Sequence, residues 1–114
     1  AMLRTEIVDG VSTITARGEL DRADQADLRE KLENLLRNGD KSQVKLDFAD
    51  VDFMDSTCGR LLSDAIAAFH QSHQKLRLKL SPQVRRTLEF LSRAGLPSAR
   101  TTLDDFRGQG LAAI

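Results

Sequence analysis

The chain has 114 residues, and its 17 Lys plus Arg balance 17 Asp plus Glu, so the formal net charge is zero. This neutrality argues against direct nucleic-acid binding and against a polybasic membrane-binding surface, because both need an excess of positive charge. Hydrophobic residues make up 40% and charged residues 30% of the chain, which is typical of one folded domain.

The N-terminal residues predict an antiparallel β-hairpin. Residues 3–8 form a short β-type run, and residues 11–17 (VSTITAR) are rich in β-branched side chains. The Asp9-Gly10 pair between them is typical of a two-residue hairpin turn. We therefore expect the two runs to pair as antiparallel neighbours.

A helix is predicted after the hairpin. Residues 18–21 (GELD) are expected to end the second strand, with Asp21 as the helix N-cap. Beyond them, hydrophobic residues recur at helical spacing, namely Ala26, Leu28, Leu32, Leu35 and Leu36. Asn38-Gly39 predicts a left-handed end to this helix.

The middle of the chain predicts another strand and a second helix. Residues 43–48 alternate between hydrophobic and polar side chains, and an acidic turn then leads to Phe53 and Met54, which we expect to be buried. Residues 55–57 (DST) are all of the type that caps a helix N-terminus. The helix that they begin has a wide hydrophobic stripe, made of Leu61, Leu62, Ala65, Ile66, Ala68 and Phe69.

The last third of the chain predicts a strand and two helices. Residues 75–80 alternate strictly, and Ser81-Pro82 is typical of a helix start with serine as N-cap and proline at the first helical position. We expect the hydrophobic face of this helix to consist of Val84, Leu88 and Leu91. Residues 94–97 (AGLP) are expected to end it, and a short final helix is expected to contain Leu103 and Phe106.

The predicted fold class is α/β: a small mixed β-sheet, made of an N-terminal antiparallel hairpin followed by β-α units, with helices mainly on one face. The β-α order calls for parallel crossovers. The strict alternation that places Lys45, Arg77 and Lys79 on one side indicates a sheet face that is partly open to water. This pattern disfavours a doubly wound nucleotide-binding fold. We expect one domain over residues 1–114, with Ala1 as the remnant of an expression tag.

The Asp55-Ser56-Thr57 segment has a structural and a functional interpretation. Asx and hydroxyl residues at a helix start satisfy free backbone N–H groups, and most such clusters are simple caps. The same position tolerates a phosphate, because free N–H groups and the helix dipole favour negative charge. A phosphate on Ser56 would add charge and bulk to the surface while the domain stays folded. That is the physical basis of a binding switch.

The ordered set of segments resembles the STAS domain family, specifically the bacterial anti-sigma factor antagonists. The resemblance rests on GELD at 18–21, VKLDF at 44–48, FMDST at 53–57, SPQVRRTL at 81–88 and AGL at 94–96. It implies a non-enzymatic, cofactor-free module that binds a kinase-like anti-sigma factor when unphosphorylated. That kinase would phosphorylate Ser56, with Thr57 as the fallback acceptor, and a phosphatase is a further implied partner. The implied partner-binding residues are Asp21, Asp55, Ser56, Thr57, Cys58, Gly59 and Arg60.

One segment departs from the family pattern. The family usually continues with Gly-Leu-Gly after the two hydroxyl residues, whereas this chain has Cys58-Gly59-Arg60. The cysteine adds a small side chain where glycine would let a partner backbone approach, and Arg60 adds a charge that can pair with a phosphate on Ser56. We therefore expect a docking groove that differs from that of the family.

Other residues suggest weaker sites. Cys58 lies in a first helical turn, where the dipole lowers a thiol pKa, so a redox sensor is an alternative to simple packing. His70 and His73 are spaced for a shared metal, but no third ligand is evident and the favoured interpretation is a helix C-terminus. The acidic run at 47–55 is interpreted as a solvated turn with an N-cap rather than a phosphoaspartate pocket. No metal site is expected.

Two alternatives to the regulatory module remain. The domain could be a constitutive STAS subunit of a lipid-transport ABC-type complex, without phosphorylation. An enzyme is disfavoured, because Ser56 lacks a Gly-x-Ser-x-Gly elbow and both histidines come late on the helix that it begins. The single cysteine excludes an intramolecular disulfide and fits a cytoplasmic location.

Overall fold

The computed structural model describes residues 1–38, 43–72 and 74–93, and it begins with the predicted hairpin. Strand β1 (Met2–Val8) pairs antiparallel with β2 (Val11–Leu20). Asp9 and Gly10 both have positive φ angles, of 51° and 79°, as a tight primed hairpin turn requires. The hairpin prediction is therefore confirmed.

The second and third strands are longer than the sequence predicts. Strand β2 does not break at Gly18: this residue takes a φ of 84° at an irregularity in the pairing with β3, and the strand ends at Leu20, directly before Asp21. Likewise, the expected acidic turn after Phe48 is part of a single strand, β3 (Gln43–Met54). The pairing of β2 with β3 has two register shifts, one between Thr15 and Arg17 and one between Gly18 and Glu19. With these shifts, the two strands stay paired in parallel as far as Leu20 and Met54.

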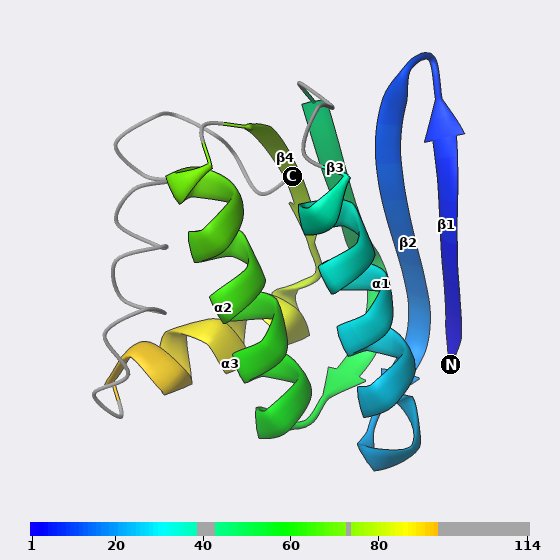
Figure 1. The fold of residues 1–114 in the computed structure, drawn as a ribbon. Helices are drawn as coiled ribbons and strands as arrows, with labels where there is room; N and C mark the ends of the chain where they lie inside the picture. The colour runs from blue at the N-terminus through cyan, green and yellow to red at the C-terminus, as the bar shows by residue number, and fades with distance from the viewer. Residues whose placement is uncertain (39–42, 73, 94–114) are drawn as a thin grey trace.

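The sheet has the strand order β1-β2-β3-β4, where β4 is Lys75–Leu80. Strand β3 pairs parallel with β2 on one side and with β4 on the other, so the sheet is mixed, as predicted (Figure 1). Because the carboxyl ends of β2 and β3 lie side by side, the segments that follow them, around Asp21 and Asp55, meet at one end of the sheet.

Helices α1 (Gln25–Arg37) and α2 (Ser56–Gln71) lie side by side on one face of the sheet, and α3 (Pro82–Arg93) crosses near its lower end (Figure 1). Asp21 is an N-cap, as predicted, but of a short 3-10 turn (Arg22–Asp24) that precedes α1. At the start of α3, the Ser81 hydroxyl accepts a hydrogen bond of 3.1 Å from the Val84 amide, and Pro82 is the first helical residue. Both helix-start predictions are confirmed.

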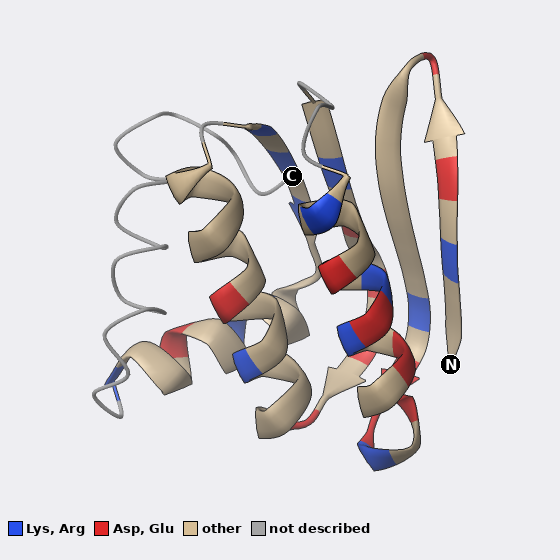
Figure 2. Ribbon diagram, viewed as in Figure 1, with Lys and Arg blue, Asp and Glu red and all other residues tan. Residues whose placement is uncertain are grey.

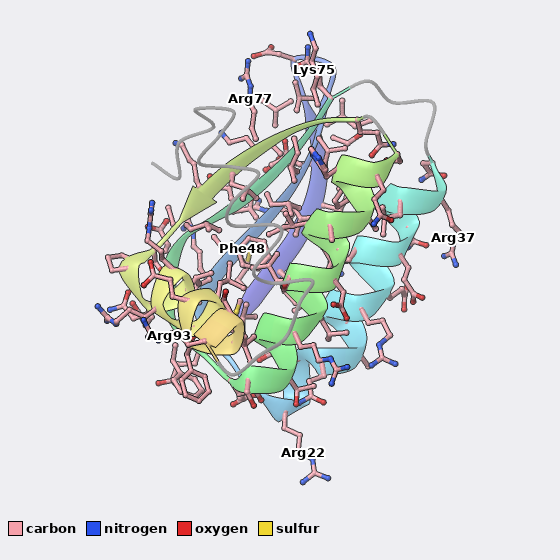
Figure 3. All side chains as sticks on the ribbon, turned by 90° about the vertical axis from the view of Figure 1, so that its left-hand side faces the viewer. Arg22, Arg37, Phe48, Lys75, Arg77 and Arg93 are labelled. Carbon is pink, nitrogen blue, oxygen red and sulfur yellow. The ribbon has the colours of Figure 1, made fainter. Side chains whose placement is uncertain are left out.

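The core lies between the sheet and the helices, and Figure 3 shows Phe48 within it. The fully buried residues of largest volume are Phe48, Phe69, Ile14, Leu20, Leu28 and Leu46. Lys75 and Arg77 project away from this core, and Lys45 pairs with Arg77 on the outer face. In the view of Figure 2, both basic and acidic positions are distributed over the strands and helices. The prediction of helices on one face and a polar opposite face is confirmed.

Several sequence predictions lie outside the described residues: the left-handed end at Gly39, the helix end at 94–97, and the final helix with Leu103 and Phe106. His73, one half of the possible histidine pair, also lies outside them. Within the described residues, no helix is both long and apolar enough to cross a membrane.

Candidate functional site at the start of helix α2

The start of α2 is fixed by Asp55. Its backbone N–H donates to the Leu20 carbonyl at 3.0 Å, which joins the helix start to the end of β2. Its carboxylate accepts one hydrogen bond from the Cys58 amide at 2.8 Å and another from the Gln25 side chain at 3.3 Å. Asp55 is thus the N-cap that the sequence predicts, and it also ties α2 to the beginning of α1.

Ser56 and Thr57 are the first two residues of α2, and both are exposed. The cap is provided by Asp55, so neither hydroxyl is needed to satisfy the free backbone N–H groups. The Ser56 hydroxyl makes no hydrogen bond with any residue in the described part of the chain. Asp21 and Arg60 are exposed nearby. The structure therefore brings the exposed members of the predicted site to one end of the domain.

Cys58 does not belong to that exposed surface. Its side chain is fully buried and its thiol donates to the Asp21 carbonyl at 3.5 Å. Burial raises the pKa of the thiol from its ordinary 9.0 to about 12, and the hydrogen bond and charge of Asp55 add to the rise. Desolvation and nearby carboxylates outweigh the helix dipole, so the thiol pKa is raised rather than lowered. The burial agrees with the favoured interpretation of Cys58 as a small packing residue, and not with the redox-sensor alternative.

Gly59 is also buried, against α3. A Cβ atom built on Gly59 would lie 2.7 Å from Thr87 Cγ2 and 3.2 Å from Leu91 Cδ1. The residue therefore allows α2 and α3 to approach closely. The structure therefore corrects the expectation that Cys58 and Gly59 contact a partner. Both residues are buried, and their role is internal packing.

A groove beside Ser56 was not predicted from the sequence. It lies between the end of β3 and α3, and its lining includes Phe53, Ser56, Arg86 and Phe90. Phe53 is 48% exposed and Phe90 60% exposed, so the expectation that Phe53 is buried is wrong. The periodicity of α3 could have placed Phe90 outside its hydrophobic stripe, but it could not show that Phe53 lies across a groove from it.

A second hollow lies on the other side of Ser56. It has a volume of about 430 Å³, and it is lined by Arg29, Ser56, Thr57, Arg60, Leu61, Asp64 and Leu91. Ser56 borders both hollows, whereas Thr57 borders only this one. Arg29 comes from α1, and the sequence analysis did not single it out.

The remaining sequence candidates do not join this site. His70 lies in the last turn of α2, at the far end of the helix from Ser56. Among the described residues, no group of three or more His, Cys, Asp or Glu side chains is placed to hold a metal ion. In the acidic run, Asp55 serves as an N-cap and Asp50 forms an exposed ion pair with Arg17 at 3.6 Å.

The fold and this end of the sheet define a small α/β domain in which a mixed four-stranded sheet presents an exposed serine at a helix start. The chain belongs to the STAS domain family, because a family model described as "Mlab, STAS domain" matches residues 3–98. No curated protein sequence gives a significant match.

Three solved structures share the fold. The chain is similar to the anti-sigma factor antagonist SpoIIAA in its unphosphorylated form, with a TM-score of 0.64, 23% identity, and coverage of 78% of this chain and 83% of that one. An anti-sigma factor antagonist from Mycobacterium paratuberculosis has a TM-score of 0.66 and 19% identity, with coverage of 88% of this chain and 91% of that one. A putative anti-sigma factor antagonist from Thermotoga maritima has a TM-score of 0.64 and 18% identity, with coverage of 82% of this chain and 81% of that one. At these identities the likeness establishes the fold.

Proposed function

We propose that this STAS domain is an anti-sigma factor antagonist that binds a kinase-like anti-sigma factor and is released when that kinase phosphorylates Ser56. The observation that carries the proposal is the exposed Ser56 hydroxyl, which is free of any capping role because Asp55 caps the helix. Its place in a fold shared with anti-sigma factor antagonists supports the proposal. The module acts in the cytoplasm without catalysis or cofactor, and a phosphatase restores the hydroxyl.

The chemistry of the switch follows from the position of Ser56. Transfer of the γ-phosphoryl group of ATP breaks the bond between the γ-phosphorus and its bridging oxygen, forms an Oγ–P bond and releases ADP, while the serine hydroxyl proton passes to a base of the kinase. The phosphoserine carries about −1.5 to −2 charges at neutral pH. This group would stand on the surface rather than in the core, so the fold remains intact. A partner packed against the unmodified serine would meet new bulk and charge, and its complex would dissociate.

The proposed docking surface consists of Asp21, Asp55, Ser56, Thr57 and Arg60, together with the Phe53–Phe90 groove. The polar residues surround the phosphoacceptor, and the two exposed phenylalanines offer apolar surface beside it. Interfaces draw much of their binding energy from aromatic side chains near their centre, with charged residues at the rim. Cys58 and Gly59 are left out because they are buried.

Ser56→Asp tests the switch. We expect the variant to bind the kinase partner about tenfold more weakly than the parent protein does. The effect should be smaller than that of phosphorylation, since one carboxylate carries less charge and bulk than a phosphate. The melting temperature should change by only a few degrees, because Ser56 is exposed and is not the N-cap. Titration calorimetry gives the affinity, and Ser56→Asn, which has similar size without charge, is the matched control. Equal affinity for all three proteins would contradict the switch.

Phe90→Ala tests the groove. We expect the affinity for the same partner to fall by about tenfold, the effect of removing a moderately important aromatic contact. Ile7→Ala is the matched control, because Ile7 is similarly exposed (64%) but lies on β1, away from Ser56. A loss of affinity that is the same for both variants would show that the groove is not part of the interface.

A further inference from the structure

We propose that Arg29 of α1 and Arg60 of α2 form an internal binding site for the phosphoryl group on Ser56, so that the modified serine joins the two helices. This inference rests on the proposed function for the identity of the phosphorylated residue. It goes further by assigning the phosphate a place on the domain itself. Phosphorylation would then produce a defined, ordered surface rather than a freely rotating charged group.

The positions of the three residues support a shared site. Ser56 and Arg60 are four residues apart on α2, so their Cβ atoms are neighbours at roughly 5–6 Å on one helix face. Arg29 lies on α1, which runs beside α2 (Figure 1). All three line the same hollow of about 430 Å³, which has space for a phosphoryl group and two guanidinium groups.

Both arginines are available to bind an anion. Each is exposed, and neither makes a hydrogen bond or ion pair with another residue in the described ranges. Guanidinium groups bind phosphate oxygens through paired N–H donors, which gives them a stronger and more directional interaction than a lysine provides. Two such groups from different helices would together balance a phosphate dianion.

One carboxylate also lines this hollow. Asp64 lies two helical turns from Ser56 on α2. Its negative charge opposes a phosphate in the hollow, and two arginines outweigh one aspartate. The formal charge of the lining residues is therefore +1 before modification, and it becomes about −0.5 to −1 once Ser56 carries a phosphate of about −1.5 to −2 charges.

The site has two measurable consequences. Nearby guanidinium groups favour the dianion over the monoanion, so they lower the second pKa of the phosphoserine below its usual value near 6. A phosphate bound by residues of both helices also stabilises the folded state. Because this stabilisation depends on the dianion, it is complete above the usual phosphate pKa and is lost as the pH falls through the lowered one.

The test uses protein with phosphoserine placed at position 56 during translation, so that no kinase is needed. Phosphorus NMR over a pH series measures the second pKa of the phosphate. We expect a pKa about half a pH unit or more below that of a phosphoserine peptide, and a return toward the peptide value in the R29A/R60A double variant. Arg37→Ala is the matched control, since Arg37 is an exposed arginine at the other end of α1. A pKa that is the same with and without the two arginines would overturn the proposal.

A second measurement distinguishes the covalent group from free phosphate. Unmodified protein is titrated with millimolar inorganic phosphate while the arginine side-chain NMR signals are followed. We expect no saturable change at Arg29 or Arg60, because only the tether to Ser56 gives the phosphate a high local concentration. Tight binding of free phosphate there would overturn the assignment to Ser56. Failure of a kinase to label Ser56 would refute the proposed function and leave these results unaffected.

Discussion

Ser56→Ala should abolish phosphoryl transfer from the proposed kinase partner. The substitution removes the Oγ atom that would receive the phosphate, while the Asp55 cap and its hydrogen bonds to Cys58 and Gln25 stay in place. The fold is therefore preserved, and the complete loss of label reports on the acceptor itself. Intact-mass spectrometry after incubation with kinase and ATP measures the result, with unmodified protein as the reference.

Thr57→Ala is the matched control, because Thr57 is the adjacent exposed hydroxyl on the same helical turn. We expect this variant to be phosphorylated as the parent protein is. The preference for Ser56 is supported by its position between the two hollows, whereas Thr57 borders only the one that contains the arginines. Label retained in Ser56→Ala and lost in Thr57→Ala would move the acceptor to Thr57.

Gly59→Val should lower the free energy of unfolding by about 2–3 kcal/mol, as expected for additional atoms in a filled interior. Even a single Cβ atom at this position would lie only 2.7 Å from Thr87 Cγ2. Thr87 cannot easily turn away, because its hydroxyl donates to the Gln83 carbonyl at 3.1 Å. Either α3 moves away from α2 or the side chains take unfavourable rotamers. Denaturant unfolding measures the change.

The cause can be isolated with smaller substitutions. Glycine to alanine inside a helix ordinarily stabilises by about 0.5–1 kcal/mol, so a destabilising Gly59→Ala would identify the contact with α3 as the reason. Thr87→Ser keeps the hydroxyl and removes Cγ2, and in this background we expect Gly59→Ala to be neutral or stabilising. If Gly59→Ala is stabilising in the parent protein as well, close packing against Thr87 does not limit this position.

The packing of Gly59 also matters for the proposed interface. Helix α3 carries Phe90 and Arg86, which line the groove beside Ser56. Because Gly59 allows α2 and α3 to approach closely, it also determines where α3 places the residues of this groove. The sequence assigned Gly59 to direct partner contact, whereas the structure gives it a role in placing α3, which carries residues of the proposed docking surface.

Local signals in the sequence were sufficient for most of the fold. Asp9-Gly10 and Ser81-Pro82 predict their turn and helix start because each acts through its own backbone. The alternation in β3 and β4 predicts one buried face because strand side chains repeat every two residues. The Asp55-Ser56-Thr57 segment was predicted to cap a helix for the same local reason, and Asp55 is the residue that does so.

The features missed by the sequence analysis depend on contacts between distant segments. The local sequence at Gly18 is typical of a strand end. Gly18 nevertheless lies inside β2, because the strand continues through an irregularity in its pairing with β3. Val51 is buried, although it is out of phase with Val44, Leu46 and Phe48, because the register shift between β2 and β3 displaces the alternation. Arg29 joins the hollow near Ser56 only through the packing of α1 beside α2. None of these contacts has a signal within its own segment.

The most direct measurement of the central claim compares two forms of one protein, unmodified and phosphorylated at Ser56, for binding to the kinase-like anti-sigma factor of the same host. Titration calorimetry in the presence of ADP measures both dissociation constants without further phosphorylation. We predict that the phosphorylated form binds at least about a hundredfold more weakly. Equal dissociation constants would contradict the switch and favour a constitutive STAS subunit.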